Sequence, residues 1–357
     1  MKNICFLIGN LNNSGGTERV TSLIANELSK SGYNISILSL NYGSEPFFLL
    51  NSTIETHSLY QRKISFKRNL LGTIFKIRSF VKRKDIDTLV VVDSISCVFT
   101  VPALYGLKIN HICWEHFNFN VDLGIVYRRI GRKLAARYCD YIVTLTSRDK
   151  ELWENGLENI RAKIVSIANP TPYENVKCTP SLEFKTILAM GRLTYQKGFD
   201  ILIDAWSKVK IENSDWTLRI VGSGEDEIAL KSKAKILKIS ESIDFVPVTN
   251  NVEQYYRTSS FYCLSSRFEG FGMVMVEAQS FGLPVIAFNC EAGPSDIIKN
   301  GLNGYLVEEQ NSDKLAISIN NACKISDENY EKLVTQSKVM SERYYIKNVL
   351  NSWTRIL

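Results

Sequence analysis

Two glutamates, Glu269 and Glu277, stand eight positions apart in the segment SSRFEGFGMVMVEAQSFGLPV, with Gly270 and Gly272 in the turn between them. The apolar spacing that follows predicts a helix opening near Met273, which places Glu277 about one turn inside it. The free backbone N–H groups and the positive dipole end of such a helix are a natural place for sugar hydroxyls or a phosphate. We therefore expect these carboxylates to hold a sugar or a ribose. The alternative is that they form only a solvated helix face.

Two cations stand in a second segment, ILAMGRLTYQKGFDILIDAW, where a predicted strand ends at Gly191 and a loop carries Arg192 and Lys197. Arg offers a planar fork to phosphate oxygens and Lys a point charge, so the pair could neutralise a departing diphosphate. The alternative is that both are ordinary exposed side chains. The next predicted strand ends in VGSGE, where Gly222 and Gly224 would let a ligand approach the backbone closely.

Strands and helices alternate along the whole chain, which predicts α/β structure with parallel sheets. A helix is expected over Thr17–Ser31. Strands are expected near residues 4–9, 35–40, 88–92, 111–114 and 141–144, and again near 186–190, 217–221, 242–245, 261–264 and 284–287. At 357 residues the chain fits two domains of ordinary size.

The domain boundary is expected in Asn169–Ser181, which gathers three prolines and has no hydrophobic period. We therefore predict two Rossmann-like, doubly wound domains that face each other across a cleft. The first domain would comprise residues 1–170 and the second residues 171–340. Residues 341–357 would form a helix that packs back on the N-terminal domain.

Taken together, these motifs resemble the retaining glycosyltransferases of family four, which adopt the GT-B architecture. The resemblance covers nearly the whole chain, and it implies that residues 1–170 bind the acceptor and residues 171–340 the nucleotide sugar. It is carried by Gly15-Gly16-Thr17-Glu18-Arg19, Gly191-Arg192 with Lys197-Gly198, Val221-Gly222-Ser223-Gly224-Glu225, and the Glu269-x7-Glu277 pair followed by Gly282-x-Pro284-Val285.

The resemblance implies a role for each matching residue. Arg192 and Lys197 would bind the donor diphosphate, Glu277 the ribose, and Glu269 the donor sugar. The remaining donor-site positions would act largely through their backbone, with the phosphate against the first helix at Gly16; they are Gly15, Gly16, Gly222, Gly270, Phe271 and Gly272.

His116, in the segment CWEHFNFN, is similar in position to a histidine that in this family often lies near the donor sugar. It would orient the sugar or the acceptor, with Glu115 as an alternative polar contributor and a purely structural role as the other possibility. His57 and His111 stand in less suggestive contexts. Asn289–Pro294 departs from the family's glycine-rich turn, which could shift sugar preference, whereas Gly293 is retained.

The resemblance also implies retention of anomeric configuration and a metal-independent enzyme. We find no DxD pair with a flanking apolar strand and no carboxylate placed as a nucleophile, so front-face attack is expected, with orientation and electrostatics doing most of the catalysis. No cofactor is expected. Two rivals stay open: a GT-B nucleotide-sugar epimerase or phosphorylase, and a non-catalytic, membrane-associated protein that binds a nucleotide sugar.

The net charge of +6 is unevenly spread, because residues 1–170 carry about 22 Lys and Arg against 14 Asp and Glu. Two segments account for much of this excess: the basic amphipathic stretch Ile64–Lys84, which includes Phe66 and Lys67, and the helix-spaced set Arg128, Arg129, Arg132, Lys133 and Arg137. We expect them either to contact an anionic membrane surface or to be ordinary solvated helix faces. Nucleic acid fits poorly, since the aromatic residues lie with the apolar face.

No apolar run is long enough to span a bilayer, and the N-terminus reads as a strand and not as an export signal. The eight cysteines show no CxxC pair or metal-like spacing and look like reduced, buried thiols. We therefore expect a cytoplasmic hexosyltransferase, peripheral on the inner face of the cell membrane. Its donor would be a UDP-sugar, and its acceptor a lipid-linked or lipopolysaccharide-type saccharide in surface polysaccharide or O-antigen assembly.

Overall fold

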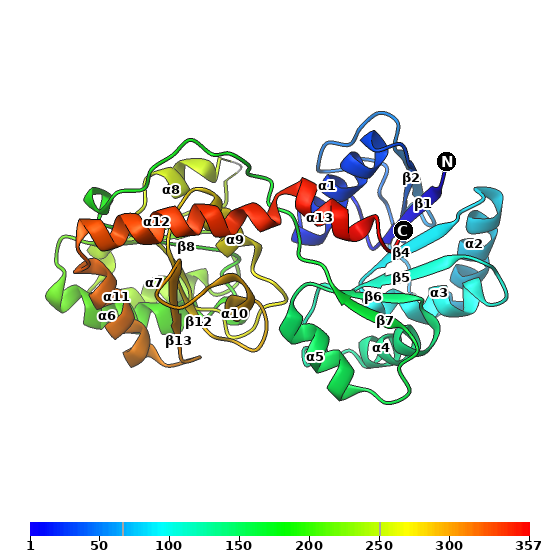
Figure 1. The fold of residues 1–357 in the computed structure, drawn as a ribbon. Coiled ribbons are helices and arrows are strands. Elements are labelled where there is room, and N and C mark those ends of the chain that lie inside the picture. The colour runs from blue at the N-terminus through cyan, green and yellow to red at the C-terminus, as the bar shows by residue number, and fades with distance from the viewer. Residues whose placement is uncertain (66–67, 250) are drawn as a thin grey trace. The chain divides into compact units, whose positions relative to one another are not determined.

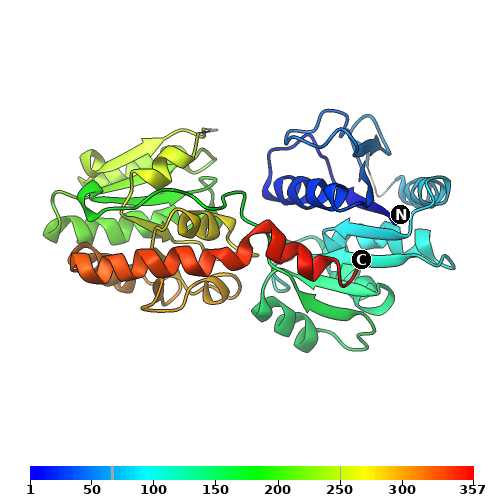
Figure 2. The ribbon, with the colours of Figure 1, turned by 45° about the horizontal axis from the view of Figure 1, so that its top comes forward.

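The computed structural model describes residues 1–65, 68–249 and 251–357 and divides the chain into two compact units. The first unit comprises Met1–Pro170 and Ile346–Leu357, and the second comprises Thr171–Tyr345. Each unit is a parallel sheet with helices on both faces, as Figures 1 and 2 show. The expectation of two parallel-sheet, Rossmann-like domains is therefore confirmed.

In the first unit, the described strands lie in the spatial order β3 (Glu55–Ser58), β2 (Asn34–Ser39), β1 (Asn3–Ile8), β4 (Thr88–Val92), β5 (Asn110–Trp114), β6 (Tyr141–Thr144) and β7 (Lys163–Ser166). Every neighbouring pair is parallel. The central strands β1, β4 and β5 are buried apolar runs, as parallel strands covered on both faces must be.

The helices of the first unit are α1 (Gly16–Lys30), α2 (Leu70–Arg83), α3 (Cys97–Leu104), α4 (Val126–Tyr138), α5 (Ser147–Gly156) and α13 (Ile346–Trp353), with a 3-10 turn η1 (Ser94–Ser96). α2 packs on α3 and α3 on α4, whereas α13 packs on α1. Figure 1 shows α13 in red beside α1 in blue. The indole ring of Trp353 meets that of Trp114 edge to face, with centroids 4.9 Å apart.

The return segment differs from the predicted one. α12 (Asp327–Ser341) and the 3-10 turn η5 (Glu342–Tyr344) belong to the second unit, so the returning segment begins at Ile346 and not at residue 341. The extended backbone of Tyr345 ends η5 and separates it from α13, so the helix predicted over 341–357 is interrupted at this residue.

In the second unit, the described strands lie in the order β10 (Ile243–Val246), β9 (Thr217–Val221), β8 (Thr186–Met190), β11 (Phe261–Leu264), β12 (Val285–Phe288) and β13 (Gly304–Val307). Its other helices are α6 (Phe199–Glu212), α7 (Glu227–Ile236), α8 (Glu253–Arg257), α9 (Met273–Ser280), α10 (Pro294–Ile297) and α11 (Ser312–Cys323), and its other 3-10 turns are η2 (Leu182–Phe184), η3 (Tyr195–Lys197) and η4 (Ser240–Ser242). α6 packs on α11 and α7, and α9 on α12.

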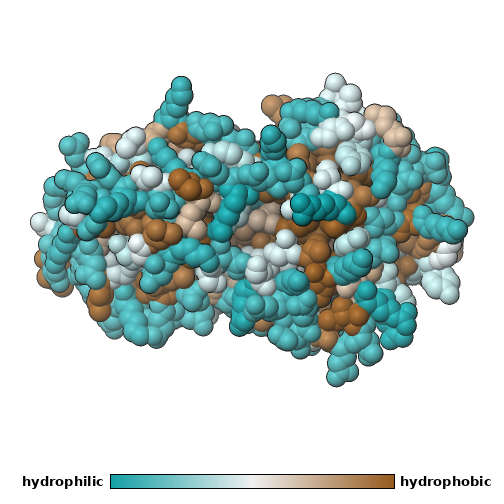
Figure 3. All heavy atoms as spheres, in the orientation of Figure 1, coloured by the Kyte–Doolittle hydropathy of each residue, from teal (hydrophilic) through white to brown (hydrophobic). Residues whose placement is uncertain are grey.

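The core of each unit lies between its sheet and its helices. In the second unit, Trp206 of α6 and Phe261 of β11 are both fully buried in such a core. Figure 3 shows the outer surface, where hydrophilic residues cover most of the visible face of both units and hydrophobic ones are scattered among them.

Candidate functional site

The predicted donor residues of the second unit follow the carboxyl ends of neighbouring strands. Arg192 comes directly after β8, Gly222 after β9 and Glu269 after β11. Because β9, β8 and β11 are adjacent and parallel, their carboxyl ends meet at one edge of the sheet. That edge is where open α/β sheets bind ligands.

Lys197 and Glu269 form an ion pair at this edge, with Lys197 Nζ 2.6 Å from Glu269 Oε1. The Ser266 hydroxyl donates to the same carboxylate oxygen over 2.6 Å. The Glu269 side chain is only 7% exposed and that of Lys197 19%. The structure thus brings two of the predicted site residues together and orients the lysine through a buried carboxylate.

The loop that carries Lys197 is fastened to the loop that carries Glu269. The Arg267 guanidinium donates to both carboxylate oxygens of Asp200 over 2.9 and 2.7 Å. It also lies over the Tyr195 ring, 4.0 Å from the centroid. The Ser265 hydroxyl donates to the Lys197 carbonyl oxygen over 2.9 Å. Sequence reasoning missed these supporting residues because no spacing pattern joins positions almost seventy residues apart.

Arg192 is exposed, and it forms no ion pair or hydrogen bond with the residues that the structure describes. Its position is set by the end of β8. There the buried Tyr262 hydroxyl donates to the Met190 carbonyl oxygen over 3.1 Å and accepts from the Met190 N–H over 3.3 Å. The backbone that leads into Arg192 is therefore fixed, and the guanidinium group is available to an anion.

Glu277 lies inside α9 and is buried. Its Oε2 accepts a hydrogen bond of 3.0 Å from the Tyr256 hydroxyl, whose ring stacks on Phe281 with centroids 5.1 Å apart. Burial and the Glu277 carboxylate hold the pKa of Tyr256 well above its usual range, so the phenol remains a donor. No pattern in the sequence pointed to Tyr256, which comes from α8. Binding of a ribose by Glu277 stays a prediction.

Glycines around this edge allow the loops to approach one another. An added Cβ at Gly222 would overlap the Gly191 carbonyl oxygen, and one at Gly224 would overlap the Leu193 carbonyl. The reason for glycine at these two positions is thus backbone packing within the chain, which differs from the ligand approach that the sequence suggested. A ligand contact at Gly222 stays a prediction.

The turn before α9 is supported from the segment after β12. Gly272, the N-cap of α9, has a φ of 89° and Gly293 has a φ of 106°, conformations that favour glycine. An added Cβ at Gly293 would press on the Phe271 carbonyl oxygen. The Phe271 ring packs edge to face on Tyr344 with centroids 5.6 Å apart. The segment Asn289–Pro294 departs from the family's glycine-rich turn, but it still packs against the backbone of residues 270–272.

In the first unit, Gly15 is the N-cap of α1 and Gly16 its first residue. The space that a Cβ at Gly16 would enter is open, whereas one at Gly15 would meet the Glu18 carboxylate, which accepts a bond of 2.8 Å from the Thr17 hydroxyl. The N-terminal end of α1 thus already has an anionic group beside it, the Glu18 carboxylate. Phosphate binding at this helix end stays a prediction.

His116 follows β5, with its ring centroid 4.5 Å from that of Trp114. Its Nε2 atom is buried and has no hydrogen-bond partner among the described residues. Burial lowers the pKa of His116 to about 3, so the imidazole is neutral at any ordinary pH. A neutral ring with a free buried nitrogen can hydrogen-bond a ligand but is a weak base.

Glu115 has a structural task, and its contribution to the site beside His116 stays a prediction. It is fully buried and accepts from the N–H groups of His116 and Phe117 over 3.0 and 3.1 Å. Arg128 and Arg132 approach its carboxylate to 3.7 and 3.5 Å. The carboxylate thus fixes the backbone that carries His116 and balances two buried guanidinium groups.

The predicted basic set on α4 is only partly a surface feature. Arg128 and Arg132 are buried, and Arg128 pairs with both oxygens of Asp93 over 3.0 and 2.9 Å. Arg129, Lys133 and Arg137 are exposed. Two of the five charges assigned to a membrane or solvent face therefore belong to an internal ion-pair network.

In the other basic segment, Ile64–Lys84, only Leu70–Arg83 form the helix α2, and Phe66 and Lys67 lie outside the described residues. Leu71 and Phe75 are 68% and 67% exposed, whereas Ile77 and Phe80 are buried against the sheet. Lys82 and Arg83 are also exposed. Across the described part of the chain, no helix has the length and apolar character needed to traverse a bilayer.

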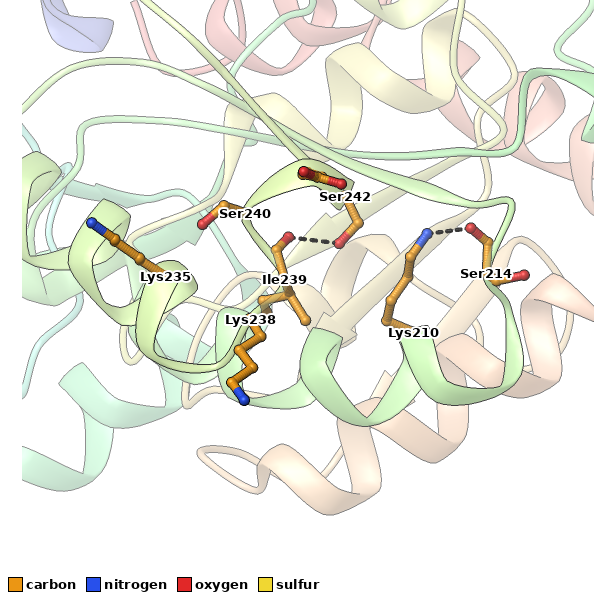
Figure 4. Close-up of a pocket in the computed structure, with 8 residues that line it drawn as sticks. Lys210, Ser214, Lys235, Lys238, Ile239, Ser240 and Ser242 are labelled. Atoms are coloured by element: carbon orange, nitrogen blue, oxygen red, sulfur yellow. Dashed lines mark hydrogen bonds between the residues drawn. The ribbon is translucent and has the colours of Figure 1, made fainter.

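A separate hollow of about 700 Å³ lies at the amino ends of β9 and β10, away from the predicted site residues (Figure 4). Lys210, Lys235 and Lys238 line it. Lys210 donates to the Ser214 carbonyl oxygen. These lysines lie at or just beyond the carboxyl ends of α6 and α7, where cations offset the helix dipole. The positive charge around the hollow therefore has a structural explanation.

Two family models together match most of the chain. The model described as Glycosyltransferase Family 4 matches residues 14–174, and that described as Glycosyl transferases group 1 matches residues 176–340.

The chain is similar to several curated proteins over its whole length. It is 40% identical to an uncharacterized glycosyltransferase of Haemophilus influenzae and 31% identical to the amylovoran biosynthesis glycosyltransferase AmsD of Erwinia amylovora, in each case over 100% of both chains. It is 25% identical, over 100% of this chain and 98% of the other, to a Campylobacter jejuni α-1,4-N-acetyl-D-galactosaminyltransferase whose name gives a saccharide on undecaprenyl diphosphate as its substrate.

Solved structures share the fold. The lipopolysaccharide outer core galactosyltransferase WaaB superposes with a TM-score of 0.77 at 23% identity, over 99% of this chain and 100% of that one. Anabaena HepE in complex with UDP-glucose superposes with a TM-score of 0.79 at 17% identity, over 99% of each chain.

Proposed function

The chain belongs to the family 4 glycosyltransferases, and we propose that it transfers a hexose from a nucleotide diphosphate donor to a lipid-linked saccharide during assembly of a bacterial surface polysaccharide. Support for the pathway comes from the full-length similarity to AmsD. Support for an acceptor on a lipid diphosphate comes from the full-length similarity to the Campylobacter enzyme. UDP is the proposed nucleotide, and no cofactor is required.

The arrangement that carries this proposal is the Lys197–Glu269 ion pair, which shares one sheet edge with Arg192. When the bond between the anomeric carbon and the diphosphate oxygen breaks, negative charge develops on the leaving group. Lys197 and Arg192 would neutralise that charge in place of a metal ion. Because Glu269 already holds Lys197 in position, the lysine does not have to move while the bond breaks.

We propose front-face transfer with retention. The acceptor hydroxyl forms its new bond on the face that the diphosphate leaves, and the departing phosphate oxygen takes the hydroxyl proton. His116, neutral and with an unpaired buried nitrogen, would hydrogen-bond the sugar or the acceptor and not act as the base. Glu277 and the first turn of α9 would hold the donor's ribose and sugar.

The proposed place of action is the inner face of the cell membrane, through the first unit. Leu71 and Phe75 form an exposed apolar pair one turn apart on α2, and the exposed cations Lys82 and Arg83 lie at its end. Each cation near an anionic lipid surface contributes on the order of 1 kcal/mol to binding. A lipid-linked acceptor would be met at such a surface.

The direct test is mass spectrometry of lipid-linked saccharides after the purified chain is incubated with a panel of UDP- and GDP-sugars. We expect one donor to add one hexose without added Mg²⁺ or Mn²⁺, and NMR of the product to give the donor's anomeric configuration. Loss of donor without any saccharide product would favour an epimerase. Donor binding without turnover of any kind would favour a non-catalytic protein.

The matched variants are Lys197→Ala and Lys208→Ala. Lys208 is half-exposed and pairs with Asp313 on the surface, so its removal should leave turnover unchanged. Removal of one transition-state electrostatic group typically costs about 10²–10³ in kcat, and we expect such a loss for Lys197→Ala with circular dichroism unchanged. Equal kcat values for the two variants at saturating donor would contradict the assigned role.

A further inference from the structure

A cluster of sulfur and imidazole ligands lies inside the first unit, and none of its members is assigned to the proposed glycosyl transfer. Cys97 opens α3, His111 and Cys113 lie on β5, and Cys139 is the C-cap of α4. All four are buried. Their separations in the sequence fit no metal motif, and it is the βαβα winding that brings them together.

The ligand atoms of three members converge on one point. The Cys97 Sγ, the Cys139 Sγ and a ring nitrogen of His111 all lie within 4.8 Å of one another. The Cys139 Sγ is 3.5 Å from His111 Nδ1. In a tetrahedral site with zinc–sulfur bonds of about 2.3 Å and zinc–nitrogen bonds of about 2.0–2.1 Å, neighbouring donors stand roughly 3.5–3.8 Å apart. The cluster is thus already close to the dimensions of such a site.

A further thiol lies near these three. Cys113 is two residues from His111 on β5, so the two side chains share one face of the sheet. Cys113 is not among the residues whose ligand atoms all lie within 4.8 Å of one another. The ligand set that the geometry supports is therefore Cys97, His111 and Cys139.

His111 is held in the orientation that a metal ligand needs. Its Nε2 lies 3.0 Å from the Thr100 hydroxyl, which directs Nδ1 toward the cysteine sulfurs. Its backbone N–H donates to the Asp140 carboxylate over 2.8 Å. Metal-binding histidines in proteins are ordinarily fixed by such a bond from the other ring nitrogen.

The charge balance suits a buried site. A divalent cation held by two thiolates and a neutral imidazole is uncharged as a whole, which removes the main penalty for burying it. Binding would release the two thiol protons to solvent. Access is available from a groove of about 700 Å³ beside α3 and α4, whose lining includes His111 and Asp140.

From this geometry we propose that Cys97, His111 and Cys139 form a structural site for a thiophilic divalent cation, for which Zn²⁺ is the best match. Sulfur and imidazole donors in tetrahedral array favour zinc over Mg²⁺ or Ca²⁺. The cation would tie α3 and α4 to β5. This site is independent of the proposed glycosyl transfer.

The test is elemental analysis of the full chain, purified without chelators from zinc-containing medium and freed of any histidine tag. We expect about one zinc per chain, falling to roughly a tenth in Cys139→Ala, because loss of one structural ligand sharply weakens zinc binding. The matched control is Cys263→Ala, since Cys263 is equally buried but belongs to the second unit. It should keep its zinc.

Cobalt gives a second readout that does not depend on the variant folding. Wild-type protein stripped of metal at mildly acidic pH and reloaded with Co²⁺ should show the intense visible bands of tetrahedral cobalt and a thiolate charge-transfer band. Zinc should bleach both. Wild-type protein that takes up neither metal, or cobalt spectra without the thiolate band, would overturn the proposal and leave the cluster as hydrogen-bonded thiols.

Discussion

At the scale of single residues, Glu115 and His116 are adjacent in sequence but have different tasks. The Glu115 carboxylate sits between two buried guanidinium groups and accepts two backbone N–H bonds, so it supports the loop. His116 has a ring nitrogen with no partner in the described structure, so it is free to meet a ligand. Sequence spacing alone could not separate the two, because both are polar residues at the end of the same strand.

Glu115→Ala should destabilise the fold, because it leaves Arg128 and Arg132 short of a buried counter-charge. Breaking a buried ion pair from one side typically costs about 3–5 kcal/mol, and we expect a loss of that order in urea unfolding. Glu151→Ala is the matched control, since its pair with Arg148 is exposed and worth at most about 1 kcal/mol. If both variants unfold at the same urea concentration, the internal network contributes no stability.

The pKa of His116 predicts how stability varies with pH. In the fold the pKa is about 3, against an ordinary value of 6.5, so below pH 6.5 the unfolded chain takes up the proton first. The contribution of the neutral His116 imidazole to the free energy of unfolding is complete above pH 6.5. It is lost as the pH falls toward 3, by up to about 1.4 kcal/mol per pH unit. Urea unfolding of wild type and His116→Gln between pH 5 and 8 measures it. Stability of the wild type should fall relative to the variant below pH 6.5, whereas a relative gain on acidification would mean a protonated imidazole in the fold.

At the scale of elements, the site depends on loops that pack closely at the ends of parallel strands. Central strands such as β4 and β11 were predictable because a strand covered on both faces is a continuous apolar run. The edge strands β3 and β7 were missed, since Glu55–Ser58 and Lys163–Ser166 are short and partly polar. The contacts between loops, such as Asp200 with Arg267, are long-range and leave no periodic signal.

Two glycine substitutions distinguish packing from ligand approach. Gly222→Ala would push into the Gly191 carbonyl oxygen and should lower the free energy of unfolding by about 1–3 kcal/mol. Gly16→Ala meets open space at the start of α1, so stability should change by no more than about 1 kcal/mol. If a donor phosphate sits against this helix end, Gly16→Ala should instead raise the donor KM. Thermal unfolding and donor titration of the two variants check both statements, and an unchanged KM for Gly16→Ala would remove α1 from the donor site.

At the scale of the whole molecule, positive charge is concentrated in the first unit. Residues 1–170 have an excess of about eight cations, whereas the rest of the chain is slightly acidic. In the structure Arg128 and Arg132 are buried. The exposed cations Lys82 and Arg83 lie on the same helix, α2, as the exposed apolar pair Leu71 and Phe75. Sequence could locate the basic helices but not decide which of their charges face inward.

Binding to vesicles tests the membrane part of the proposal. The purified chain should sediment with phosphatidylglycerol-containing vesicles and not with phosphatidylcholine alone, and added salt should weaken binding because exposed charges are screened. Leu71→Ser with Phe75→Ser should weaken binding by about tenfold, since burying two such side chains even in part is worth more than 1.4 kcal/mol. The control is Ile211→Ser with Ile228→Ser, two apolar residues of the second unit that are even more exposed, at 83% and 81%. The same loss in the control, or equal binding to neutral vesicles, would show that α2 is an ordinary solvated helix.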